Sequence, residues 1–166
     1  CHRNCLPSTW RGGNADEAAA GLLASVEILK QLTVDYPEKP RYAFELADIL
    51  SIDTAELRDT TFGKTNWQRL EEAERIARRL NNAFPNQPEY QTLYANALYR
   101  LGLILHRNDQ PSLAIRHLKE SVKHFQELLD RFPNTPAYVA SLGQVAGDFG
   151  TMLRDDGQLE ESRRVL

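Results

Sequence analysis

The chain has 166 residues, of which 42% are hydrophobic and 26% are charged, so it can form one folded core and does not resemble an intrinsically disordered segment. Its net charge of −3 gives no general attraction to phosphate backbones, which argues against nucleic-acid binding. No apolar run approaches the roughly 18 residues that span a bilayer, so membrane insertion by this segment is not expected.

Both cysteines, Cys1 and Cys5, lie in the first five residues, so no disulfide framework is expected and a reducing compartment such as the cytoplasm is favoured. His2 lies between them, but a metal site would need a further ligand. We therefore interpret residues 1–14 as the end of a truncated helix. A lipid-modified Cys1 is the alternative. No cofactor and no metal site are predicted.

Helical periodicity runs from Ala15 to about Val34, with one apolar face made by Ala18, Leu22, Leu29 and Leu32. Pro37 ends this helix, because the residue before a proline is pushed out of the helical region. The next helix is expected over about 41–58, with a kink or an early end at the irregular pair Asp53-Thr54.

The linker 59–65 ends in Gly-Lys-Thr, the tail of a phosphate-binding loop, but Arg58 stands where that motif needs a glycine, so we reject the site. A helix over about 67–83 follows, with a predicted core stripe of Leu70, Ala73, Ala77 and Leu80. The clearest hairpin has helices over about 88–107 and 111–131 around a turn at 108–110. A last pair starts at Pro136, turns at 155–157 and continues to Leu166.

A phrase of the form aromatic-Pro-x-x-Pro-x-Tyr begins at Tyr36, Phe84 and Phe132, a constant spacing of 48 residues. A fixed period of this size indicates a repeat array in which each unit packs on the next. The repeat frames are about 1–35, 36–83, 84–131 and 132–166. Leucine recurs at equivalent positions, as a shared core predicts: Leu22, Leu70, Leu118 and Leu166; Leu32, Leu80 and Leu128; Leu57, Leu105 and Leu153.

Within one repeat, Leu101-Gly102, Leu105, Ala114 and the closing Phe132-Pro133 resemble the tetratricopeptide repeat, and Phe149-Gly150 continues the pattern. The usual unit has about 34 residues, so this chain resembles the long-helix variant of bacterial signalling proteins, often attached to a kinase or membrane segment. The resemblance implies one all-α domain over 1–166. It would be an α-solenoid of antiparallel helical hairpins in a right-handed superhelix of about three and a half repeats. HEAT or armadillo repeats are the fold alternative, which Gly102 and Gly150 disfavour.

The resemblance also implies a non-catalytic scaffold that binds a protein or peptide, here an acidic one, in a concave groove. The candidate groove residues are Arg58, Asn96, Tyr99, Arg100, His106, Arg107, Gln144 and Arg154, with Leu103, Asp148 and Thr151 beside them and Asp48, Ser51 and Ile52 at the matching positions of the preceding repeat. The alternative is that the basic residues only offset helix dipoles. The family's clamp for a terminal carboxylate is not found.

An enzyme is not predicted, because no serine or cysteine nucleophile stands with a base. His117, Glu120 and His124 share one helix face, but we interpret them as a solvated polar stripe rather than a metal site. The second functional hypothesis is a structural spacer or self-assembly module that stacks through exposed repeat ends, such as Leu159 and Val165.

Overall fold

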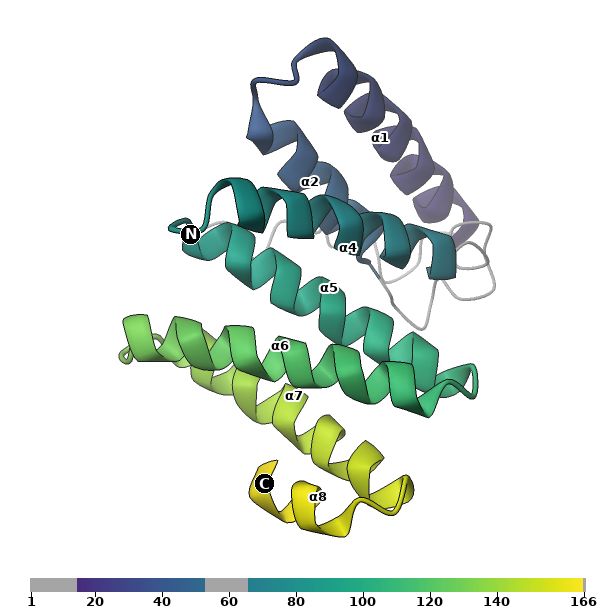
Figure 1. The fold of residues 1–166 in the computed structure, drawn as a ribbon. Coiled ribbons are helices and arrows are strands. Elements are labelled where there is room, and N and C mark those ends of the chain that lie inside the picture. Colours follow the sequence, from purple (N-terminus) through teal and green to yellow (C-terminus); the bar gives the residue numbers. More distant parts are fainter. Residues whose placement is uncertain (1–14, 53–65, 166) are drawn as a thin grey trace.

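The computed structural model describes residues 15–52 and 66–165, and within these ranges the chain is all-α (Figure 1). The helices in these ranges are α1 (Ala15–Asp35), α2 (Pro40–Leu50), α4 (Asn66–Ala83), α5 (Pro88–Arg107), α6 (Pro111–Arg131), α7 (Pro136–Asp155) and α8 (Leu159–Val165). Four of them start with a proline, which is favoured at the first helical position because its missing N–H would have no partner there. The predicted bounds of α5 and α6 are confirmed.

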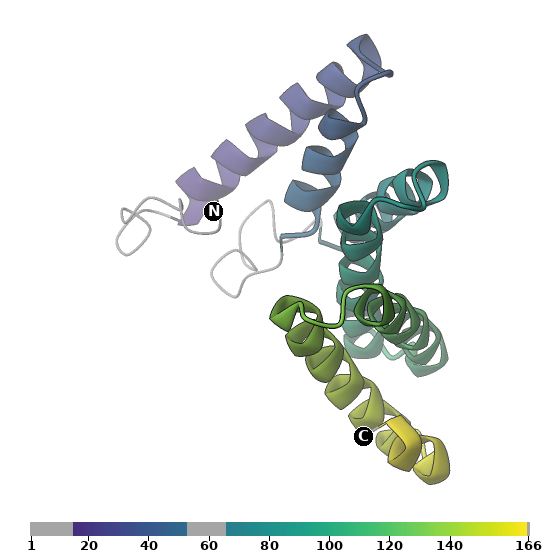
Figure 2. The same cartoon turned by 90° about the vertical axis from the view of Figure 1, so that its left-hand side faces the viewer.

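Each helix packs mainly on the helices before and after it in the chain, which makes a helical array. Helices α1 and α2 lie at one end of this array and α7 and α8 at the other, as two perpendicular views show (Figures 1 and 2). Helix α5 is the centre, because it packs against both α4 and α6 and also touches α2. The prediction of an all-α array of packed helices is therefore confirmed.

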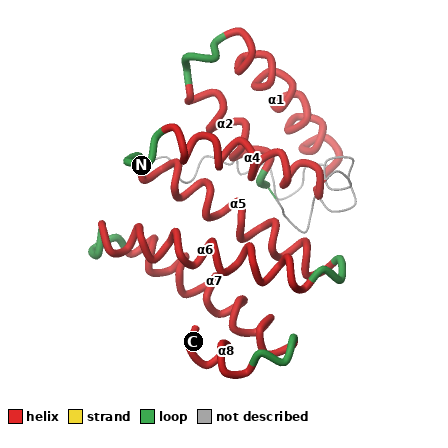
Figure 3. Tube along the Cα trace, in the orientation of Figure 1, coloured by secondary structure: helices red, strands yellow, loops and turns green. Residues whose placement is uncertain are grey.

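The repeated phrase has the same backbone structure at each occurrence, and its three connectors lie along one edge of the array (Figure 3). In each connector a backbone N–H donates to the carbonyl oxygen of the aromatic residue three positions earlier: Lys39 to Tyr36 at 3.0 Å, Gln87 to Phe84 at 3.0 Å and Thr135 to Phe132 at 3.2 Å. Each aromatic residue also meets the tyrosine of its own phrase, with ring centroids 5.9, 5.5 and 6.2 Å apart. The 48-residue period is thus a period of structure.

The turns at the opposite edge also repeat. Asp109 and Gly157 are equivalent positions, and both have the left-handed conformation, with φ of 54° and 81°. In each turn the next residue donates its backbone N–H into the preceding helix, Gln110 to Leu105 at 3.0 Å and Gln158 to Leu153 at 2.8 Å. These bonds satisfy carbonyl groups that a helix end leaves without partners.

Helix α2 ends at Leu50, within the helix predicted over 41–58 and shortly before the kink or early end expected at Asp53-Thr54; residues 53–58 lie outside the described ranges. The side chain of Arg69, on α4, accounts for this end. Its guanidinium donates to the carbonyl oxygens of Leu50 at 2.8 Å and Ile52 at 3.2 Å. Arg69 is only 6% exposed, so it is a buried cap on α2 rather than part of the solvated face of α4.

Two apolar clusters form the core. One contains Val26 and Leu50, and the other contains Phe125 and Phe149. The described members of the leucine columns are buried or half-buried, as predicted, while Leu57 and Leu166 lie outside the described residues. On α1 the most buried positions are Ala19 and Val26, whereas the predicted stripe is only half-buried, because this end helix packs mainly on α2. None of the described helices combines the length and apolarity required of a membrane span.

Candidate functional site

Most of the predicted groove residues of α5 and α7 line one groove between these two helices. Its volume is about 550 Å³. Helix α5 contributes Asn96, Tyr99, Arg100, Leu103 and Arg107, and α7 contributes Ser141, Gln144, Val145 and Asp148. Only Ser141 and Val145 were absent from the predicted set. The 48-residue spacing explains the result, because equivalent positions of successive repeats face the same side of the array.

A three-residue hydrogen-bonded cluster joins the two walls of this groove. The Tyr99 hydroxyl donates to Asp148 Oδ2 at 2.5 Å, and Gln144 Nε2 donates to the Tyr99 oxygen at 3.0 Å. Tyr99 is 9% exposed, and burial, together with the hydrogen bond to Asp148, raises its pKa to about 12. The tyrosine therefore stays neutral at physiological pH and holds α5 and α7 in a fixed relationship.

The positive charge of the groove centres on Arg100. Within the described ranges it has no hydrogen bond and no ion pair, and it is half-buried in the groove wall. Its charge also reaches Asp48 on α2. Burial and the neighbouring Glu45 carboxylate raise the pKa of Asp48, while Arg100 and Arg41 act in the opposite direction. Arg100 is therefore a cation that a ligand carboxylate could approach from the groove.

His106, Thr151 and Arg154 were also predicted but are not among the residues that line this groove. His106 is half-buried near the end of α5, and its Nδ1 atom is buried without a hydrogen-bond partner among the described residues. Arg154 is exposed in the last turn of α7 and is not among the groove-lining residues. Arg58 lies outside the described residues. The predicted column of Arg58, His106 and Arg154 therefore remains a prediction.

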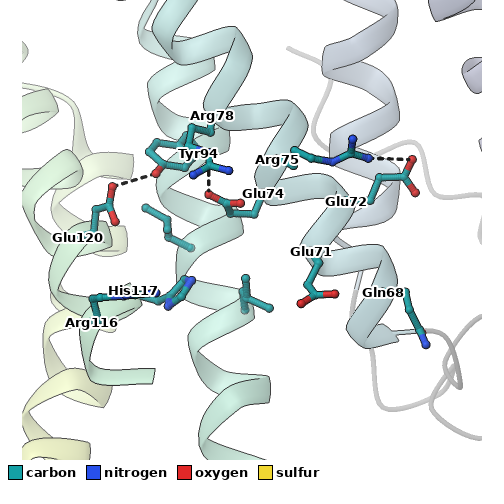
Figure 4. Close-up of a pocket in the computed structure, with 12 residues that line it drawn as sticks. Gln68, Glu71, Glu72, Glu74, Arg75, Arg78, Tyr94, Arg116, His117 and Glu120 are labelled. Atoms are coloured by element: carbon teal, nitrogen blue, oxygen red, sulfur yellow. Dashed lines mark hydrogen bonds and ion pairs between the residues drawn. The ribbon is translucent and has the colours of Figure 1, made fainter. Parts of the chain in front are cut away.

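A second, larger groove of about 1010 Å³ lies between α4 and α6, with α5 as its floor (Figure 4). It is lined by Gln68, Glu71, Glu72, Glu74, Arg75 and Arg78 of α4, by Tyr94, Leu98 and Leu101 of α5, and by Arg116, His117 and Glu120 of α6. Charged side chains of both signs form its walls. Sequence reasoning did not predict this groove.

Most charges at the bottom of this second groove are already engaged. The Tyr94 hydroxyl donates to Glu120 Oε1 at 2.9 Å, and Arg78 Nε lies 3.5 Å from Glu74 Oε1 (Figure 4). Burial raises the pKa of Glu74, and the charge of Glu120 adds to this effect. Burial and the bond to Glu120 likewise raise the pKa of Tyr94. Glu74, Arg78, Tyr94 and Glu120 are thus already engaged with one another across the floor and walls of the groove.

Ion pairs join the neighbouring pairs of helices on either side of this groove, α1 with α4 and α6 with α8. Lys30 on α1 pairs with Glu72 on α4 at 3.2 Å, and Lys119 on α6 pairs with Glu161 on α8 at 2.7 Å. The positions equivalent to Lys30 and Glu72 in the middle gap are Arg78 and Glu120. These two side chains bond instead to Glu74 and Tyr94, which leaves the middle gap unbridged by this pair.

The polar stripe of α6 has structural partners. His117 Nδ1 lies 2.8 Å from the Leu113 carbonyl oxygen, and the His124 ring packs edge-on against Tyr94 with centroids 5.0 Å apart. Among the described residues, no group of three His, Cys, Asp or Glu side chains is arranged to hold a metal ion. Cys1, His2 and Cys5 lie outside these residues.

Comparison of the chain with protein-family models, curated proteins and solved structures finds no significant match.

The important residues that sequence reasoning missed are Arg69 and the pair Arg78 and Glu120. Nothing in the sequence around Arg69 distinguishes it from an exposed basic residue of the same helix. The equivalent position of the next repeat is not an arginine but His117. Arg78 and Glu120 were detectable in principle, because each is the 48-residue equivalent of a member of the Lys30–Glu72 pair.

Proposed function

We propose that the chain is a non-catalytic scaffold that binds a protein or peptide in the α5–α7 groove. In this proposal the helical array is a tetratricopeptide-like α-solenoid with a right-handed superhelix, and α2, α5 and α7 line its concave face. The observation that carries the proposal is that Asn96 and Arg100 line one groove together with their repeat equivalents, Gln144 and Asp148, and with Tyr99. By the same resemblance, the array would serve a larger bacterial signalling or regulatory protein.

The chemistry of the groove favours an acidic segment as the ligand. Arg100 and Arg107 supply guanidinium groups, which bind carboxylates through charge-assisted hydrogen bonds. Asn96 and Ser141 add neutral polar groups beside them. Asp148 would repel an acidic ligand, but one of its oxygens already accepts the Tyr99 hydroxyl. An extended peptide with a carboxylate beside Arg100 is therefore the best match.

A peptide display library selected against the intact chain tests this proposal. We expect the enriched peptides to carry Asp or Glu and to bind an Arg100→Glu variant at least about tenfold more weakly, since one charge-assisted contact is worth about 1.5–3 kcal/mol. Arg116→Glu is the matched control, because it makes the same charge change in the α4–α6 groove. Equal binding to the wild type and to Arg100→Glu would rule out this groove as the site.

The second candidate is a spacer or self-assembly module. Apolar side chains are exposed towards both ends of the array, with Ile28 62% and Val34 74% exposed on α1 and Leu159 52% exposed on α8. Exposed apolar side chains at the ends of a repeat array favour association between copies. If no peptide is enriched and the chain forms concentration-dependent oligomers in sedimentation, this candidate replaces the first.

A further inference from the structure

The repeated connectors share a backbone structure but differ in what fills the space beside them. Next to the first connector, residues 36–40, an apolar socket of about 310 Å³ lies against the C-terminal half of α4. Tyr36, Pro40 and Ala43 form one wall, and Ile76, Leu80 and Phe84 form the other. Ligand pockets range from about 300 to 1,000 Å³, so this socket fits a large side chain better than a cofactor.

At the second connector the chain fills the equivalent space with its own side chains. The positions 48 residues later hold Gln91, His124, Glu127 and Arg131. Gln91 Nε2 donates to Glu127 Oε2 at 2.8 Å, and Arg131 Nη1 donates to Gln91 Oε1 at 3.2 Å. Arg131 Nη2 also lies 3.4 Å from the carbonyl oxygen of Asn86, in the connector itself. Gln91 is only 5% exposed, so the network closes this place to solvent.

The first connector cannot form this network, because the same four positions are Ala43, Ile76, Arg79 and Ala83. The two alanines are too short to reach the connector, and isoleucine has no polar atom to offer. Arg79 reverses the charge of Glu127. The substitutions leave a hollow with apolar walls, and Arg79 at its rim has no hydrogen bond or ion pair among the described residues.

The rim of the socket combines exposed aromatic rings with a positive balance of charge. Tyr36 and Phe84 are 43% and 40% exposed. Single exposed apolar residues are ordinary, but apolar surface gathered around one hollow is typical of interaction sites. Lys39 Nζ lies 4.8 Å from the Tyr36 ring centroid, and the socket is lined by two cationic side chains, Lys39 and Arg79, but by a single carboxylate, Glu38. An anionic group on a partner is therefore favoured here.

We propose that this socket binds a partner protein through a bulky aliphatic side chain whose neighbouring residue carries a carboxylate. The aliphatic group covers Ala43 and Ile76 and takes the space that Gln91 and Arg131 fill in the next repeat. The carboxylate pairs with Arg79. The socket lies beside the connectors, away from the residues of the α5–α7 groove, so the proposal does not depend on the function of that groove.

NMR titration of the 15N-labelled chain tests the proposal with a defined probe, the acetylated and amidated peptide Gly-Ser-Gly-Leu-Glu-Gly-Ser. We expect shifts of the backbone amides of Ala43, Ile76 and Leu80 at millimolar peptide. Replacing the leucine of the peptide by alanine should weaken binding about tenfold, because the buried apolar area is lost. Replacing its glutamate by glutamine should weaken binding severalfold.

Two variants of the protein separate the apolar and charged parts. The quadruple variant Ala43→Gln, Ile76→His, Arg79→Glu and Ala83→Arg transplants the network of the second connector and should abolish binding. Arg79→Gln leaves the socket open and should make the glutamate and glutamine peptides bind equally, which decides the question even if the quadruple variant does not fold. Equal binding to the folded quadruple variant, or no shift around the socket at several millimolar peptide, overturns the proposal. Changes in the amide chemical shifts around the socket that depend on protein concentration in the absence of peptide also overturn the proposal, because a second copy of the chain would then be the occupant.

Discussion

The Tyr99 hydroxyl on α5 and the Asp148 carboxylate on α7 are joined by a 2.5 Å hydrogen bond across the proposed binding groove. The two residues are 49 positions apart, one repeat plus one residue, so the bond links successive repeats. Together with the hydrogen bond from Gln144 to the Tyr99 oxygen, it ties α5 directly to α7, and both helices also pack on α6. The stability of the array and the shape of the groove therefore depend on the same side chains.

Tyr99→Phe removes this tie without changing the ring. We expect the free energy of unfolding to fall by about 1–2 kcal/mol. This value is at the lower end of the range for hydrogen bonds to charged groups, because water can replace the hydroxyl beside Asp148. Urea denaturation measures the change. Tyr36→Phe is the control, since the Tyr36 side chain is 43% exposed and its loss should be nearly neutral. Equal effects of the two substitutions would contradict a structural role for the bond.

The raised pKa of Tyr99 predicts a loss of stability at alkaline pH. An unfolded tyrosine ionises near pH 10, whereas folded Tyr99 has a pKa of about 12. The stabilisation is therefore complete below pH 10 and is lost as the pH rises towards 12. We expect the wild type to lose more stability over this interval than Tyr99→Phe does. Parallel pH profiles of the two proteins would show that Tyr99 does not contribute.

Arg69→Ala removes the buried cap at the end of α2. The carbonyl groups of Leu50 and Ile52 would lose a charged donor, so we expect the free energy of unfolding to fall by about 2–3 kcal/mol. Hydrogen exchange should become faster in α2 before the rest of the array. The control is Arg75→Ala on the same helix, where the arginine side chain is 61% exposed and the expected change is within about 0.5 kcal/mol.

The equivalent turn positions Gly157 and Asp109 should respond in opposite directions. Gly157→Ala places a Cβ at φ 81° and should cost about 1 kcal/mol. Asp109→Gly relieves a φ of 54° and should stabilise by less than about 1 kcal/mol, because glycine also gains freedom in the unfolded chain. Thermal unfolding of both variants tests the pair. A neutral Gly157→Ala would mean that the turn adapts to a side chain.

The close approach of α5 and α6 depends on Gly102. A Cβ at this position would lie 2.0 Å from Leu118 Cδ1, so Gly102→Ala forces Leu118 to move and should cost about 1–3 kcal/mol. Gly143→Ala on α7 meets nothing within 4 Å and should instead stabilise by about 0.5–1 kcal/mol through helix propensity. Chemical denaturation gives both values, and the same sign for both would contradict the packing account.

Local patterns were enough to predict the bounds of α5 and α6 and the apolar stripe of α4. Proline begins each of these two helices and turn residues end them, so their limits depend on the residues at the limits themselves. The groove between α5 and α7 was also largely predictable. A fixed repeat places the equivalent positions Asn96 and Gln144 on the same side, but their assignment to a groove came from the resemblance to the tetratricopeptide repeat.

Side-chain partners far apart in sequence were not predictable. The end of α2 at Leu50 depends on Arg69, 19 residues later, and nothing around Leu50 signals that cap. The socket at the first connector is open because Ala43 and Ala83 are too short to fill the space beside it. At the second connector the equivalent residues, Gln91 and Arg131, fill that space. The sequence by itself determined the helices, their order and their period, because proline, turn residues and apolar periodicity act over a few residues. Only the tertiary structure decided which polar groups are satisfied and which hollows stay open, because burial and hydrogen bonding depend on neighbours that folding brings together.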